Sequence, residues 1–232
     1  MGSDEKGDEL PKEVAAIRDA ISAFFDIADE KDRKIGSAVH GVYAFYDYDG
    51  EPIYVGRTYE KLRGRIGRHL TNQRTDAVAM NVLDPFEVAE IEIWPLDDEV
   101  ANLPDKEAIK SFLDQAEYTV FQRVLEASTL RAVLNEKEMT PAQPIQLPQS
   151  YRQRIIPDGI FESRKHPDVR IARRANTIAN LARVISERSV SKGLRKTLLT
   201  QARRLELLAS QRLEELGIED PAPRNQPSRP GG

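Results

Sequence analysis

Apolar residues recur at helical spacing near both ends of the chain. After an acidic, polar leader over residues 1–10, one side of a helix is marked by Val14, Ile17, Ile21, Phe24, Phe25 and Ala28. Two similar stripes come late in the chain, at Ile171, Ala175, Ile178, Ala182 and Ile185 and at Leu194, Leu198, Leu205, Leu208 and Leu216. This period is typical of amphipathic helices. It predicts an N-terminal helix from residue 11 to about 31 and a C-terminal helical hairpin.

The middle of the chain has the pattern of a small sheet between helices. β-branched and aromatic residues cluster over residues 42–47, 52–58 and 86–96, as strands require. The first two segments flank Asp49-Gly50, a dipeptide of tight hairpin turns whose two central residues have positive φ. Helical patterns cover residues 59–72 and 104–127. The expected fold class is α+β, with a three-stranded antiparallel sheet flanked by helices.

Proline-rich segments divide the chain. Three prolines fall within residues 140–148 and four more fall after residue 218, and such segments favour linkers and disordered tails. The expected parts are a leader with the first helix over 1–35, a core over 36–139, a linker over 140–150, a basic helical extension over 151–218 that begins irregularly, and a tail over 219–232.

The composition excludes several classes of protein. The 232 residues include no cysteine, so a disulfide framework, a thiolate zinc site and a thiol nucleophile are excluded. No apolar run approaches the ~20 residues of a membrane span. The acidic start does not resemble a signal peptide. We therefore expect a cytoplasmic protein with no membrane partner.

Charge is segregated along the chain although the net charge is only −4. Residues 57–74 and 164–204 are strongly basic, whereas residues 84–117 are strongly acidic. A basic face on an acidic molecule suits docking to a polyanion, but solvated helix faces give the same pattern. The candidate polyanion contacts are Lys61, Arg63, Arg68, Arg74, Arg173 and Arg174.

Two tyrosines lie on the two strands of the expected hairpin. Tyr43 ends the motif Gly41-Val42-Tyr43, and Tyr54 lies in Ile53-Tyr54-Val55-Gly56-Arg57-Thr58. If the strand register allows, both hydroxyls share one face of the sheet. Arg65 and His69 are one turn apart on the next helix, so they project in the same direction.

A carboxylate, Glu117, lies at the edge of the apolar stripe of the long helix over residues 104–127. A charge in such a place is costly unless it is paired or bound to a metal. The helix by itself leaves two alternatives open, which are a salt bridge to an arginine and a metal site.

Together these motifs resemble the GIY-YIG nuclease family over residues 41–135. The resemblance implies a DNA phosphodiesterase with one divalent ion, Mg²⁺ with Mn²⁺ as a substitute, held by Glu117. It also implies that Asn135 is the asparagine that closes the family core. Magnesium suits one carboxylate plus waters. The ion would bind a non-bridging phosphate oxygen and the leaving 3′ oxygen.

The resemblance also suggests roles for the remaining site residues. Arg65 would hold the phosphate, and Tyr43, in preference to Tyr54, would take the proton of the attacking water. A tyrosine pKa near 10 needs help from Arg57, His69 or the metal. Many family members have a lysine where this chain has Arg57, and an arginine cannot act as a base.

The expected function is a metal-dependent DNA endonuclease of the restriction or phage-defence type, since the chain pairs a compact core with one basic extension. An enzyme that cuts palindromes could form a homodimer. The alternatives are a DNA-binding or assembly protein with an inactive core and a structure-specific repair nuclease.

Overall fold

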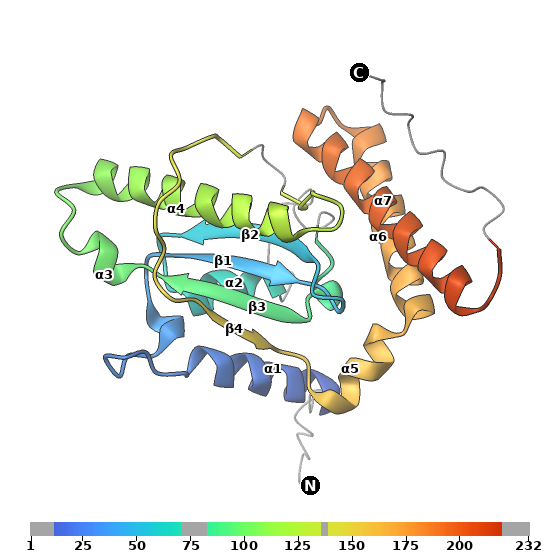
Figure 1. Ribbon diagram of the computed structural model, residues 1–232, viewed down its shortest axis with the longest axis horizontal. Coiled ribbons are helices and arrows are strands. Elements are labelled where there is room, and N and C mark those ends of the chain that lie inside the picture. The colour runs from blue at the N-terminus through green and yellow to red at the C-terminus, as the bar shows by residue number, and fades with distance from the viewer. Residues whose placement is uncertain (1–11, 71–82, 136–138, 220–232) are drawn as a thin grey trace, which may run out of the picture.

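The computed structural model describes residues 12–70, 83–135 and 139–219. Its sheet has four antiparallel strands in the order β2-β1-β3-β4, as Figure 1 shows. The strands are β1 (Gly41–Tyr46), β2 (Pro52–Thr58), β3 (Glu90–Pro95) and β4 (Tyr151–Arg154). The three expected strands are confirmed, but the expected strand count is one too low. β4 was missed because its sequence, Tyr-Arg-Gln-Arg, has no apolar alternation.

Every expected helix is present. The helices are α1 (Lys12–Phe25), α2 (Leu62–Leu70), α3 (Asp97–Val100), α4 (Lys106–Ala127), α5 (Asp158–Lys165), α6 (Pro167–Glu187) and α7 (Lys192–Glu215), with short 3₁₀ turns η1 (Ile35–Ser37) and η3 (Pro85–Glu87). Within the described residues, no helix combines the length and apolarity of a membrane span.

The first helix ends earlier than its apolar pattern predicts. α1 stops at Phe25 because a tight turn follows, in which the Asp29 carboxylate accepts hydrogen bonds from the backbone N–H groups of Lys31 and Arg33. Asp32 has a φ of 59° in this turn. An Asp side chain that bonds to nearby backbone favours turns over helix.

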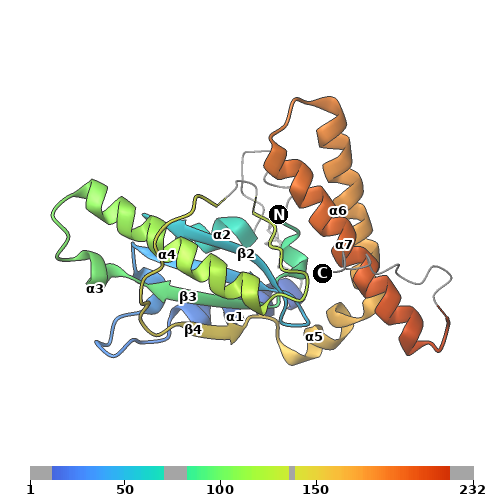
Figure 2. The same cartoon turned by 45° about the horizontal axis from the view of Figure 1, so that its top comes forward.

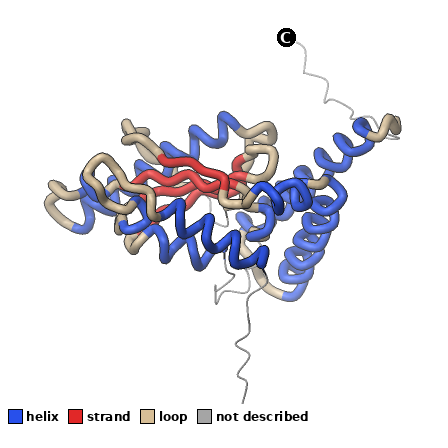
Figure 3. Tube along the Cα trace, turned by 90° about the horizontal axis from the view of Figure 1, so that it is seen from below, coloured by secondary structure: helices blue, strands red, loops and turns tan. Residues whose placement is uncertain are grey.

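Two apolar layers enclose the sheet, as the edge-on view in Figure 3 shows. One layer lies between the sheet and α4 and includes Val42, Ala44, Trp94, Leu113 and Val120. The other lies on the opposite face and is built with α1, α2 and the α6–α7 hairpin; its members include Phe25, Tyr43, Phe45, Ile66, Leu181 and Leu194. Alternate residues of β1 therefore serve opposite layers.

The hairpin between β1 and β2 has a different turn from the one expected. Only Gly50 has positive φ (74°), so Asp49 does not adopt the conformation of a two-residue turn. Instead Asp47 and Glu51 pair through Asp47 N–H and Glu51 C=O, and a three-residue loop ends on the glycine. The Asp47 carboxylate accepts hydrogen bonds from the N–H groups of Asp49 and Glu51, which stabilises this loop.

The expected division at residues 140–150 is also wrong. The segment is not a free linker, because Ile145 and Leu147 pack on the α4 layer and Ile145 N–H donates to Thr119 Oγ1. The chain then enters β4 directly, and the following Ile155 and Ile156 are buried in the core. The extension over 151–218 therefore begins inside the sheet.

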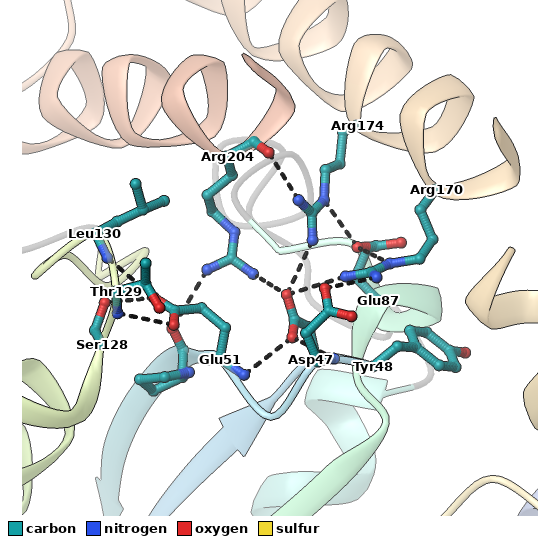
Figure 4. A network of polar contacts seen from close by, with 12 residues as sticks. Asp47, Tyr48, Glu51, Glu87, Ser128, Thr129, Leu130, Arg170, Arg174 and Arg204 are labelled. Carbon is teal, nitrogen blue, oxygen red and sulfur yellow. Dashed lines mark hydrogen bonds and ion pairs between the residues drawn. The ribbon is translucent and has the colours of Figure 1, made fainter. Parts of the chain in front are cut away.

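The C-terminal hairpin docks on the core through a buried ionic cluster, shown in Figure 4. Three arginines, Arg170, Arg174 and Arg204, donate to the Asp47 carboxylate at 3.2, 2.9 and 2.5 Å. Arg174 also donates to Glu87 at 3.0 Å. All five residues are buried. Asp47 lies in the β1–β2 turn, so the cluster joins the two tyrosine-bearing strands to helices more than a hundred residues away.

Asp47→Ala should destabilise the protein strongly. The change leaves three buried guanidinium groups without their shared acceptor, and breaking such a pair costs about 3–5 kcal/mol. The free energy of unfolding in urea measures this loss. Asp49→Ala is the matched control, because Asp49 pairs with Arg170 from the same turn but is half exposed, and exposed pairs contribute about 0–1 kcal/mol. Equal losses in the two variants would contradict the role of the buried cluster.

Candidate active site

Strand register places both tyrosines on one face of the sheet. Tyr43 pairs with Gly56 and Phe45 pairs with Tyr54, so the two tyrosines are diagonal neighbours. Their ring centroids are 6.1 Å apart. The register therefore confirms that Tyr43 and Tyr54 share one face of the sheet, which the sequence alone left open.

Gly56 leaves room for this arrangement. A Cβ atom at Gly56 would lie 2.6 Å from the Tyr43 hydroxyl oxygen and 2.9 Å from Cε1 of Tyr54. Any larger residue would therefore displace one of the two rings. The glycine of the second motif is required by packing between the tyrosines rather than by a turn.

Helix α2 brings His69 and Arg65 to the same face. His69 is buried, and its Nε2 lies 2.9 Å from the Tyr43 hydroxyl. The half-buried Arg65 contacts the same hydroxyl. Burial lowers the pKa of Arg65, but Tyr43, Tyr54 and Glu60 outweigh burial, so its pKa is raised. Its buried Nε has no hydrogen-bond partner among the described residues, which leaves a donor for an incoming acceptor.

Glu117 and Arg57 meet on the opposite face of β2. Arg57 Nε lies 3.1 Å from Glu117 Oε2, and the guanidinium also pairs with Asp114. Because Arg57 pairs with Val42 rather than with Tyr43, its side chain faces α4. The expectation that Arg57 assists Tyr43 is therefore wrong, and the cation beside that hydroxyl is Arg65. Asp114 was missed, although it is three residues before Glu117 and so shares its side of the helix.

The Glu117 carboxyl is held in an environment that disfavours its charge. Burial raises its pKa to about 7, even though Arg57 and Arg65 act in the opposite direction. Asp114 raises the pKa further. The side chain keeps 17% of its surface exposed. Arg65 influences both Glu117 and the tyrosines, so the two halves of the site meet around β2, the edge strand of the sheet.

Asn135 supports this edge through its side-chain amide. Its Nδ2 donates to the carbonyl of Val55 at 2.7 Å, and its Oδ1 accepts from the N–H of Val55 at 3.2 Å. The side chain thus takes the place of a neighbouring strand. These bonds give Asn135 a positioning role at the edge of β2.

The candidate polyanion contacts differ in their availability. Lys61 is exposed, whereas Arg63 pairs with Asp26 and Arg68 with Glu60. Arg173 packs over the ring of Phe86 and has a buried Nη1 without a hydrogen-bond partner among the described residues.

Two further candidates need separate comment. The expectation that Arg174 contacts a polyanion is wrong, because its guanidinium is buried and bonded to Asp47 and Glu87. Arg74 lies outside the described residues.

Comparison with known families agrees with this geometry. Residues 39–124 match the family model of the GIY-YIG catalytic domain. The chain contains a GIY-YIG domain. The match includes both tyrosines, Arg57, Arg65, His69 and Glu117, and it ends before Asn135. Comparisons with curated proteins and with solved structures return no match.

The GIY-YIG domain implies nuclease activity on DNA, which raises the question of whether its residues fit a divalent ion. No group of three or more His, Cys, Asp or Glu side chains converges in the described part of the chain. A single carboxylate is nevertheless enough for Mg²⁺, which keeps several waters and shares the oxygens of its substrate. The raised pKa of Glu117 shows that Arg57 does not fully compensate its charge. The donor set therefore fits one such ion.

Glu117→Gln should stabilise the metal-free protein at high pH. The raised folded-state pKa means that the unfolded state ionises first, so wild-type stability falls between about pH 4.5 and pH 7. A glutamine cannot ionise. The Tm difference between variant and wild type should therefore grow from pH 5 to pH 8. The exposed Glu126 on the same helix supplies the control variant, Glu126→Gln. A constant difference for Glu117→Gln would disprove the proposed cost of its charge.

Proposed function

We propose that this protein is a magnesium-dependent endonuclease that hydrolyses DNA phosphodiester bonds at the edge of β2. The observation that carries the proposal is the meeting of Tyr43, His69 and Arg65 on one side of this strand with Glu117 on the other. This set offers a proton acceptor, a phosphate donor and a carboxylate ligand. These are the groups that phosphodiester hydrolysis requires.

The contact between Tyr43 and His69 supplies a proton path. As water attacks phosphorus, its proton passes to the Tyr43 oxygen while the phenolic proton passes to Nε2 of neutral His69. A new P–O bond forms from the water, the bond to the leaving oxygen breaks, and the leaving oxygen takes up a proton from the solvent. Since a free tyrosine has a pKa near 10, the phenolic proton needs an acceptor, and the hydrogen bond to His69 provides one.

Two charged groups would stabilise the phosphate as negative charge builds up. Arg65 lies beside Tyr43, and its Nε has no hydrogen-bond partner among the described residues; the guanidinium would donate to a phosphoryl oxygen. Glu117 would hold the divalent ion, which when bound supplies positive charge to the phosphate oxygens. Mn²⁺ should replace Mg²⁺, because both favour oxygen ligands.

Glu117→Gln should abolish magnesium-dependent nicking of supercoiled plasmid. The variant loses the proposed ligand but keeps the basic residues. Asp114→Asn is the matched control, since it removes a carboxylate that pairs with Arg57 one turn away on the same helix. It should retain nicking. Full activity of Glu117→Gln in magnesium, or nicking by wild type in excess chelator, would refute the metal assignment.

Tyr43→Phe should reduce hydrolysis by about 10²-fold or more, the lower range for losing a positioned acid or base. The ring still packs, so the Tm should change little. Tyr54→Phe is the control from the same face of the sheet and should retain much more activity. If Tyr54→Phe is inactive and Tyr43→Phe is active, the two tyrosines exchange roles. Single-turnover rates with duplex DNA measure the difference.

We also propose that the enzyme belongs to restriction or phage defence. The support is architectural, because the described residues form one GIY-YIG core with a docked helical hairpin and show no zinc-type ligand cluster. Such an enzyme should yield discrete fragments from long unmodified duplex DNA. Cleavage confined to branched or damaged substrates would favour a repair role instead.

A further inference from the structure

Tyr59 is an exposed aromatic residue that directly follows β2. It is 48% exposed, whereas Tyr43 and Tyr54 of the candidate site are buried. Tyr43 serves the proposed proton path, and the exposed ring of Tyr59 has no part in that path. A tyrosine ring offers a large apolar face with a polar tip, so this face is open to a ligand outside the core.

The ring is held in place from two sides. Its hydroxyl accepts a hydrogen bond from Arg57 Nη1 at 2.9 Å, and the Arg57 guanidinium lies over the ring, 5.4 Å from its centroid. Thr58 fixes the backbone around Tyr59, because its Oγ1 accepts from the N–H of Glu60 at 3.0 Å and donates to the Glu60 carbonyl at 2.8 Å. A side chain that is ordered in advance loses little freedom when a ligand packs on it.

The same guanidinium links the ring to Glu117. Arg57 Nε lies 3.1 Å from Glu117 Oε2, so one side chain spans the distance from the proposed metal ligand to the Tyr59 hydroxyl. The electrostatics agree with this placement. Partial burial raises the pKa of Tyr59, and Arg57 opposes that rise. The charges of Asp114 and Glu117 raise the pKa further, so Tyr59 lies beside the candidate site.

Tyr59 lies at the end of the sheet away from the C-terminal hairpin. The preceding Thr58 pairs with Gly41 at the start of β1, whereas the hairpin docks on Asp47, directly after β1 ends. Figure 2 shows the α6–α7 hairpin standing at that other end of the sheet. A change at Tyr59 therefore leaves the ion pairs that dock the hairpin in place.

We propose that the exposed ring of Tyr59 packs against a nucleotide next to the scissile phosphate of the DNA substrate. The proposal rests on the proposed nuclease function and adds a substrate contact to it. Successive nucleotides rise ~3.4 Å along a strand, so a phosphate held at Glu117 brings its neighbouring sugar and base close to the ring. An uncharged aromatic face suits this position, because the carboxylates of Asp114 and Glu117 repel further phosphates. Such packing tolerates every base, so it would supply affinity and not sequence choice.

The test is the affinity for a fluorescent DNA duplex in the presence of chelator, so that no cleavage occurs. Tyr59→Ala should bind about tenfold more weakly than wild type, within the range for losing an aromatic residue that stacks on a nucleotide. Tyr59→Phe keeps the ring, loses only the hydroxyl and should bind like wild type. Single-stranded DNA separates the two parts of the nucleotide. A larger loss for Tyr59→Ala on the single strand indicates contact with a base, and an equal loss indicates contact with the sugar.

Phe86→Ala is the matched control. Phe86 is 49% exposed and also has arginines over its ring, Arg164 and Arg173. It lies four residues before Glu90, which pairs with Tyr46 at the opposite end of β1. The control variant should therefore bind DNA like wild type, and Tm confirms that each variant folds.

Tyr59→Trp gives a direct readout of the contact. Trp94 is the single tryptophan of the chain and is fully buried, so an indole introduced at position 59 supplies the solvent-exposed emission. Duplex DNA should protect this emission from quenching by acrylamide. The emission of wild type should show no such protection.

Each outcome decides the proposal. Unchanged binding by Tyr59→Ala overturns it, and so does an indole that stays accessible in the DNA complex of Tyr59→Trp. Equal losses in Tyr59→Ala and Tyr59→Phe also overturn it, because the hydrogen bond to Arg57 would then account for the effect. An equal loss in Phe86→Ala overturns it as a general effect of removing exposed aromatic residues. Nicking by wild type is measured separately. Weakened binding by Tyr59→Ala alongside an inactive wild type would support the DNA contact while refuting the nuclease proposal.

Discussion

The buried carboxylate of Asp47 is the constraint on which the arrangement of the whole chain depends. It accepts from three guanidinium groups that come from two helices, and it also fixes the turn between β1 and β2. Removing so many charges from water is costly, and only mutual pairing offsets the cost. Burial raises the pKa of Glu87 and lowers that of Arg204, which shows how strongly this site disfavours charge without a partner. The hairpin and the core therefore satisfy each other's charges.

The same docking also supports β2, the strand of the candidate site. An edge strand is open on one side, which lets groups from both faces of the sheet meet around it, but its backbone then lacks a partner. Here the turn at one end of β2 is held by the arginine cluster, and the outer edge at Val55 is held by Asn135, which is in turn bonded to Thr197. The open edge is thus kept rigid by the C-terminal helices. Rigid support of this kind is what a site with few reacting groups needs.

Local patterns in the sequence predicted most of the secondary structure, the two-tyrosine motif and the common direction of Arg65 and His69 on one helix face. These patterns failed where contacts between residues far apart in the sequence determine the structure. Arg57 lies three residues after Tyr54 in the same strand, so the alternation of side chains along a strand already puts it on the opposite face; the sequence interpretation did not apply this alternation to Arg57. β4 has no apolar face to reveal it. The sequence did contain a signal for the burial of Arg174, because this residue lies in line with Leu181 and Val184 on the buried side of α6. The sequence interpretation counted the cations of the whole segment and did not consider the position of Arg174 on the helix.

The contacts of the Arg57 guanidinium show how the site tolerates the negative charge of Glu117, which its surroundings disfavour. Glu117 ionises only near pH 7 because burial outweighs the attraction of Arg57 and Arg65. Arg57 is shared, however, since it also contacts Asp114, the ring of Tyr59 and the carbonyl of Lys110. If a cation takes the place of Arg57 at Glu117, the guanidinium keeps these other partners and is not left unpaired. A lysine, with one compact ammonium, could not divide its contacts in this way. Under the proposed function, the arginine therefore suits a carboxylate that is compensated without a metal and could be released to one.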